Sequence, residues 1–328
     1  MKIAVVIGGG SCPGIAPLVY YLHSKARQAG HSIHFFRGWD GLKLGQPASV
    51  SPDVTFLVKP GSPIGTSRYN LTGEDIASMK SQLAEFGAII AVGGNDTLSV
   101  LTRLLEFQGI RIAVPKTLDN DLMGTDYTLG HWSVVEYLVG AILRARYSTL
   151  DHHRFLVVET IGQDAGWVAL RAGRAVGADS IIIPEMGVSL PDVVKAIAER
   201  PTGLVVLTSS ARILGLETPE AEVTAGDGFG NPHYEDRRIG HLLAARIHAE
   251  FGFDARCEVL TDSVRGGSTS SFDLLLAQRF ANSAINVLSR LGPNKCVMLG
   301  LKGYRIEMSV LDQAPGRKFV AAEDILAL

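Results

Sequence analysis

The sequence KIAVVIGGGSCPG (residues 2–14) carries a run of branched apolar residues that ends directly in three glycines. An apolar run without polar alternation is typical of a strand buried on both faces, and the glycines indicate a tight turn. The run is too short for the apolar region of a secretory signal peptide. We therefore predict a first buried strand, a glycine turn and then a helix over residues 13–30.

The same order of strand, turn and helix repeats along the chain, and it restarts after a long helix predicted at 131–147. The other predicted strands are 32–36, 88–92, 111–114, 155–159, 181–183, 204–207 and 257–260. The other predicted helices are 74–86, one from the GGND turn to about 107, 165–175, 191–199, 234–251 and 271–291. Residues 216–231 lack an apolar period, which predicts a mobile loop.

This alternation predicts an α/β fold of two Rossmann-like lobes with mostly parallel sheets. A chain of 328 residues is long enough for two lobes. We expect residues 1–130 and about 256–310 to form one lobe, and residues 131–255 with the C-terminal tail to form the other. Ligands on such sheets bind at the carboxyl ends of the strands, where the glycine turns lie.

The composition favours a cytoplasmic enzyme. The formal net charge of −2 predicts no general attraction to nucleic acid or to an anionic membrane. No stretch approaches the roughly 20 apolar residues of a membrane span. Cys12, Cys257 and Cys296 lie far apart in the sequence and form neither a metal-ligand pair nor a disulfide framework, which favours a reducing compartment.

Four segments that follow predicted strands carry groups suited to phosphate chemistry. They are GGGSCPG (8–14), VGGNDT (92–97), VPKTLDND (114–121) and VRGGSTSSFD (264–273). Glycine turns before helix N-termini present free N–H groups to phosphate, although the first and last segments are also compatible with plain turns. The third segment combines a lysine, a hydroxyl and two carboxylates, which supply a cation, a base and a Mg²⁺ ligand for phosphoryl transfer.

Two other nucleotide-binding motifs are disfavoured. A Rossmann dinucleotide site needs an acidic residue at the end of the second strand, but Arg37 and Gly38 stand there. A Walker A loop needs Gly-Lys-Ser/Thr, which does not follow the first glycine run.

In their order along the chain, these segments resemble the landmarks of the phosphofructokinase family. GGGSCPG resembles the family's GG-x-x-PG phosphate loop, GTSR (65–68) its G-S-x-R turn and PKTLDND (115–121) its PKTIDND catalytic loop. GTDYTLG (124–130), HRFLVVETIGQDAGWVAL (153–170), IIPE (182–185) and VRGGSTSSFD match later landmarks. The resemblance implies the phosphofructokinase fold and phosphoryl transfer to a hydroxyl of a sugar phosphate.

The resemblance also implies roles for individual residues. Asp119 would be the general base, Lys116, Thr117 and Arg265 would complete the catalytic set, and Asn95 and Asp121 would hold Mg²⁺. The implied donor-binding residues are Gly9, Gly10, Arg68, Gly94 and Asp96. The implied acceptor-binding residues are Thr117, Asp119, Arg154, Ile161, Gly162, Gln163, Arg256, Asp262 and Arg265. Because Arg154 and Arg256 resemble arginines that reach into a neighbouring subunit's site, a homodimer or homotetramer is implied.

Asp96 and Lys116 predict the phosphoryl donor. ATP-using members of the family carry glycine at both positions. A carboxylate at residue 96 would repel the α-phosphate of a nucleotide, whereas Lys116 supplies a positive charge for pyrophosphate. The pair therefore predicts pyrophosphate as donor, with an ATP-dependent kinase as the alternative.

The chain departs from the family in the predicted acceptor pocket. Asn95 replaces an acid, Gln163 replaces an arginine, and Asp262 replaces a histidine. The family's T-E-G motif aligns with Thr208, Ser209 and Ser210. Three alternatives to a fructose 6-phosphate acceptor therefore stay open: another sugar phosphate, a polyol or unphosphorylated hydroxyl compound, and a catalytically weak paralogue that binds a phosphate metabolite.

Overall fold

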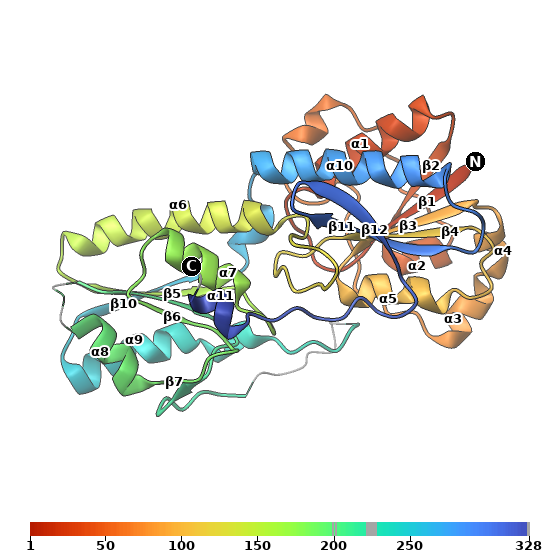
Figure 1. Cartoon of the computed structure of the whole chain (residues 1–328). Coiled ribbons are helices and arrows are strands. Elements are labelled where there is room, and N and C mark those ends of the chain that lie inside the picture. Colours follow the sequence, from red (N-terminus) through yellow and green to blue (C-terminus); the bar gives the residue numbers. More distant parts are fainter. Residues whose placement is uncertain (199, 201, 221–227, 327–328) are drawn as a thin grey trace.

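The computed structural model of the chain describes residues 1–198, 200, 202–220 and 228–326. Two α/β lobes lie side by side, and the long helix α6 (His131–Leu150) leads from the first lobe into the second (Figure 1). The prediction of two lobes with mostly parallel sheets is confirmed. The predicted helix end at Glu199 and residues 221–227 of the predicted loop lie outside the described residues.

The first lobe contains a six-stranded sheet in the order β12-β11-β4-β3-β1-β2, in which only β12 is antiparallel to its neighbour. Its strands are β1 (Lys2–Ile7), β2 (Ser32–Arg37), β3 (Ala88–Gly93), β4 (Ile110–Pro115), β11 (Cys296–Lys302) and β12 (Arg305–Val310). Every residue of β3 and β4 is buried. Helices cover both faces, which explains why these strands read as continuous apolar runs.

Helices α1 and α10 cover one face of this sheet, and α2 to α5 cover the other (Figure 1). Their bounds are α1 (Ile15–Gln28), α2 (Gly38–Lys43), α3 (Gly73–Ser78), α4 (Lys80–Ala84), α5 (Asn95–Arg103) and α10 (Ser271–Leu288), with a 3₁₀ turn η1 (Val54–Leu57) beside α1. The single helix predicted at 74–86 is two short helices instead. They meet at Met79, whose fully buried side chain joins the same core as Leu83.

The second lobe contains a parallel four-stranded sheet in the order β10-β5-β8-β6 and a two-stranded parallel sheet of β7 and β9. The strands are β5 (Phe155–Thr160), β6 (Ser180–Ile182), β7 (Val188–Ser189), β8 (Leu204–Thr208), β9 (Ile213–Leu214) and β10 (Ala255–Leu260). Helices α6 and α7 (Trp167–Ala175) pack on one face, and α8 (Leu190–Ala198) and α9 (Ile239–Phe251) pack on the other.

Two predictions about this lobe need correction. The return to the first lobe was expected at about residue 256, but β10 pairs with β5 along its whole length, and the chain returns only through η3 (Ser263–Gly266) and α10. The predicted helix at 234–251 is interrupted at Arg238, where φ is 51° between η2 (Tyr234–Arg237) and α9. A left-handed residue cannot continue a right-handed helix.

The C-terminal segment crosses from the first lobe back to the second (Figure 1). Nε1 of Trp167 donates a hydrogen bond to the carbonyl oxygen of Lys318, and the N–H of Val320 donates to the Glu185 carboxylate. The terminal helix α11 (Ala322–Leu326) follows, and its Ile325 packs against the core formed by α6 and α7. The tail therefore links the lobes next to the cavity described below.

Within the described ranges, no helix has the length and apolar character needed to cross a membrane.

Candidate active site

A polar cavity of about 90 Å³ lies where the two lobes face each other. Residues that follow β1, β3 and β4 line it from the first lobe, and residues that follow β5 and β10 line it from the second. The predicted site residues that line it are Gly9, Gly10, Arg68, Gly94, Asn95, Asp96, Lys116, Thr117, Asp119, Asp121, Gln163 and Arg265. A cavity that holds one water molecule has a volume of about 10–15 Å³, so this cavity can hold a small polar group of several atoms.

Glycine at position 10 lets two arginines approach the first loop closely. A Cβ atom at Gly10 would lie 2.8 Å from Nη1 of Arg265 and 3.5 Å from Nη2 of Arg68. Gly9 adopts a φ of 79°, which favours glycine. The loop therefore brings main-chain groups and two guanidiniums to one point, an arrangement suited to phosphate.

Gly10→Ala is expected to raise the KM for the phosphoryl donor about tenfold, because the methyl group displaces Arg265 from its position. Little stability should be lost, since the displaced atom is the end of a flexible side chain. Steady-state kinetics and thermal unfolding measure the two effects. Gly73→Ala is the matched control, because a Cβ there meets nothing within 4 Å; equal KM values in both variants would contradict the expectation.

Lys116 lies beneath the glycine loop and is 2% exposed. Its Nζ donates to the carbonyl oxygens of Gly8 at 2.8 Å and Gly10 at 2.7 Å. Burial lowers the pKa of Lys116. An ammonium has three donors, so two of them hold the loop in place and one remains for an anion in the cavity.

The loop that carries Asp119 and Asp121 turns at Asn120, whose φ is 54°. Asparagine tolerates this left-handed conformation better than most residues. The side chain of Asn120 is fully buried, donates to the carbonyl oxygen of Asp126 and accepts from the N–H of Thr128. These bonds set the turn that lets Asp119 and Asp121, on either side of it, both line the cavity.

His131 supports the same loop, although the sequence analysis assigned it no role. Its Nδ1 lies 2.7 Å from the carbonyl oxygen of Leu118, and its Nε2 lies 2.7 Å from Nη1 of Arg171. Burial and the Arg171 charge lower the pKa of His131 to about 3. The ring is therefore neutral: Nε2 accepts from Arg171, and Nδ1 donates to Leu118 next to Asp119.

The carboxylate of Asp121 suits a magnesium ion. Burial raises its pKa, Arg317 opposes this rise, and the neighbouring Asp96 adds to it. A buried carboxylate near a second one is stabilised by a divalent cation, and Mg²⁺ prefers oxygen ligands. Oδ1 of Asn95, the other predicted ligand, accepts a hydrogen bond from the N–H of Gly316 at 3.1 Å, so this side chain also holds the tail.

The C-terminal tail contributes residues that the sequence analysis missed. Arg317 lines the cavity and forms an ion pair with Asp164, in the loop after β5. The N–H of Lys318 donates to the carbonyl oxygen of Asp121 at 2.6 Å. No motif marks the tail; two adjacent basic residues after a Pro-Gly pair are the only signal that could have suggested it. Ser11, Cys12, Thr97 and Leu118, which stand in the predicted segments without an assigned role, also line the cavity, as do Phe229 and Asn231 from the second lobe.

Several predicted acceptor residues do not line this cavity. Ile161 is 1% exposed in the core, and Gly162 packs against Thr208, where a Cβ would lie 2.7 Å from Cγ2. The Asp262 side chain is 90% exposed and lies 3.7 Å from Nε of Arg265. Asp262 therefore does not line this cavity, and its predicted contact with the acceptor stays a prediction.

Arg154 and Arg256 lie at the amino ends of β5 and β10, opposite the ends that face the cavity. Both contact Asp254, with Nε–Oδ distances of 2.6 Å and 3.6 Å. Their predicted role in a neighbouring subunit's site stays a prediction.

The chain is similar to known proteins along nearly its whole length. Residues 2–288 match the family described as Phosphofructokinase. A protein of Amycolatopsis methanolica, named pyrophosphate–fructose 6-phosphate 1-phosphotransferase, is 36% identical over 88% of this chain and 87% of its own. An ATP-dependent 6-phosphofructokinase of Corynebacterium efficiens is 32% identical over 96% of this chain and 94% of its own.

Solved structures of the family share the fold. A pyrophosphate-dependent phosphofructokinase from Marinobacter aquaeolei superposes with a TM-score of 0.81 at 18% identity, covering 98% of this chain and 85% of that one. The phosphofructokinase of Saccharomyces cerevisiae gives a TM-score of 0.78 at 22% identity, and this chain covers 44% of that longer chain. The family match over residues 2–288 and the 36% identity to a named relative show that the chain belongs to the phosphofructokinase family, whose solved structures share its fold.

Proposed function

We propose that the protein transfers a phosphoryl group from pyrophosphate to a hydroxyl of a sugar phosphate, with fructose 6-phosphate as the expected acceptor. The observation that carries the choice of donor is that Asp96 and Lys116 line one cavity beside the glycine loop. The names of several relatives that are 33–36% identical agree with pyrophosphate and fructose 6-phosphate.

In this mechanism, Asp119 accepts the proton of the acceptor hydroxyl. The hydroxyl oxygen then forms a bond to one phosphorus of pyrophosphate. The bond between that phosphorus and the bridging oxygen breaks, and inorganic phosphate leaves. Lys116, Arg68 and Arg265 stabilise the negative charge on the phosphoryl oxygens. When bound, Mg²⁺ would neutralise donor charge, and Asp121 would hold it with Asp96 or Asn95 nearby.

We propose that the acceptor half of the site is completed by a second copy of the chain. Gln163 and Arg265 line the cavity from the second lobe, but Arg154 and Arg256 lie at the far edge of their sheet. Paired guanidiniums on an accessible edge suit a phosphate of a neighbouring subunit's substrate. A homodimer or homotetramer with shared sites follows, and the free cysteines fit a cytoplasmic location.

The donor is tested by thermal unfolding and by a matrix of donors and acceptors. Pyrophosphate with Mg²⁺ is expected to raise the Tm and support turnover, whereas ATP with Mg²⁺ should do neither. Asp96→Gly is expected to gain stabilisation by ATP. Asp96→Asn, which keeps the size and removes the charge, separates repulsion from steric exclusion.

A rise in Tm and turnover with ATP, but not with pyrophosphate, would favour an ATP-dependent kinase, the activity that some relatives' names give. Turnover with pyrophosphate but only with an acceptor other than fructose 6-phosphate would keep the donor and replace the acceptor. Binding of either donor without turnover of any acceptor would favour the weakly catalytic alternative.

A further inference from the structure

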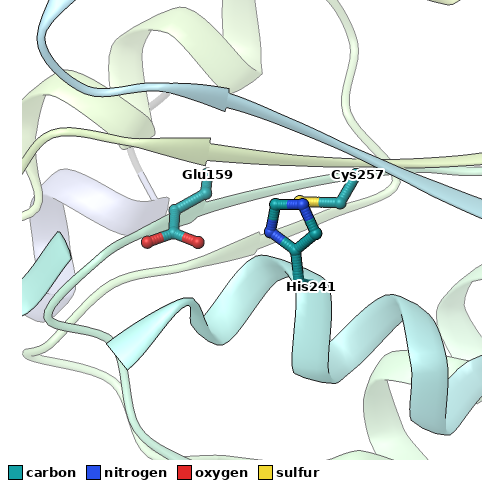
Figure 2. A group of neighbouring side chains, drawn as sticks. All are labelled: Glu159, His241 and Cys257. Carbon is teal, nitrogen blue, oxygen red and sulfur yellow. The ribbon is translucent and has the colours of Figure 1, made fainter. Parts of the chain in front are cut away.

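Three potential metal ligands meet in the second lobe, on the face of the sheet that α9 covers (Figure 2). Glu159 lies on β5, Cys257 on β10 and His241 in the first turn of α9. One ligand atom from each side chain lies within 4.8 Å of the others. Among the described residues, the lining of the proposed active-site cavity includes none of the three.

Strand register places the two strand residues on the same side of the sheet. Val259 is the partner of Glu159 in the parallel pair of β10 and β5, and Cys257 comes two residues before Val259. Side chains two residues apart on a strand point to the same face. Both ligands therefore face α9, which presents His241 between them (Figure 2).

A thiolate, an imidazole and a carboxylate are each ligands that zinc accepts in proteins. Bonds of about 2.0–2.3 Å in a tetrahedral site place ligand atoms roughly 3.3–3.8 Å apart. The observed limit of 4.8 Å is close enough for small side-chain rotations to complete the site. Three protein ligands leave a fourth position for water.

The backbone of α9 holds Glu159 by a hydrogen bond and lies close to Cys257. The N–H of Gly240 donates to Oε2 of Glu159 at 2.8 Å. A Cβ at Gly240 would lie 2.8 Å from Sγ of Cys257 and 3.0 Å from Oε2 of Glu159. This hydrogen bond orients the Glu159 carboxylate beside Cys257.

We propose that Glu159, His241 and Cys257 bind a zinc-type divalent cation that ties β5, β10 and α9 together. These two strands lead directly into the loops that carry Gln163 and Arg265, so the ion would stabilise the base of the acceptor side. The site does not depend on the proposed function.

The first test is calorimetric titration of the full chain with Zn²⁺ after treatment with a chelator, in the presence of excess Mg²⁺. One ion per chain is expected to bind and to raise the Tm. Cys257→Ala and His241→Ala should each weaken binding at least about tenfold. Cys296→Ala, a cysteine in β11 outside the cluster, is the matched control and should bind like the wild type.

Co²⁺ provides a second readout that does not need a variant. Bound Co²⁺ is expected to show thiolate-to-metal charge-transfer absorption in the wild type, and this absorption should persist in Asp119→Asn. Absence of that band, or equal Zn²⁺ affinity in the wild type and His241→Ala, would overturn the proposal and leave Glu159 only as a cap of α9. Because His241 is exposed, its variant should fold even if Cys257→Ala does not.

Discussion

Asp119→Asn is expected to lower kcat for phosphoryl transfer by about 10²- to 10⁴-fold, the range that a positioned general base contributes. The side chain lines the cavity, and the buried turn at Asn120 together with His131 beneath Leu118 holds its loop. Asparagine keeps the shape but cannot accept the proton of the acceptor hydroxyl. The measurement is steady-state turnover with pyrophosphate and fructose 6-phosphate, while the KM for each substrate should change little.

Asp119 and Asp121 lie in one loop, so a second variant is needed to tell the general base from the metal ligand. Asp121→Asn serves this purpose. This variant should need more Mg²⁺ for half-maximal rate, and excess Mg²⁺ should restore part of its activity. Excess Mg²⁺ should not rescue Asp119→Asn. If Asp119→Asn kept more than about a tenth of wild-type kcat, the assignment of the base would be wrong.

Lys116→Met is expected to lower kcat/KM for pyrophosphate by about 10²- to 10³-fold, comparable to the loss of one preorganised donor at a developing charge. Lys116 is almost fully buried, and the carbonyl oxygens of Gly8 and Gly10 already hold it. Its Nζ is therefore in position before the donor binds. Methionine keeps the length of the side chain and removes the ammonium.

The same change removes two hydrogen bonds from the glycine loop, so stability must be measured together with kinetics. Lys302→Met is a suitable control, since it removes a surface lysine that pairs with Asp126 at 3.2 Å. A loss of activity in Lys116→Met that disappears at lower temperature, together with a large fall in Tm, would indicate a purely structural role. Retained activity with pyrophosphate would contradict the donor assignment.

The half of the cavity that the first lobe lines could be predicted from the sequence because its residues follow strands. Gly10, Gly94 and Lys116 each come directly after a buried apolar run, and parallel strands end at one edge of a sheet. Local pattern and topology were therefore enough to bring these segments together. The residues that contact the cavity from this lobe agree with that expectation.

The rest depends on contacts between segments that share no pattern. Arg317 reaches the cavity only because the tail crosses between the lobes, and β10 belongs to the second sheet because it pairs with β5. Neither follows from apolar period or spacing, since both depend on which surfaces pack together.

The sequence by itself determined the α/β alternation, the glycine turns and the chemistry of the Lys116–Asp121 loop, because these are properties of neighbouring residues. Only the tertiary structure decided that His131 supports this loop, and that Cys257 meets Glu159 and His241. These three residues come from two strands and a helix, so their distances along the chain carry no information about their distances in space. Packing of α9 against the sheet brings them together.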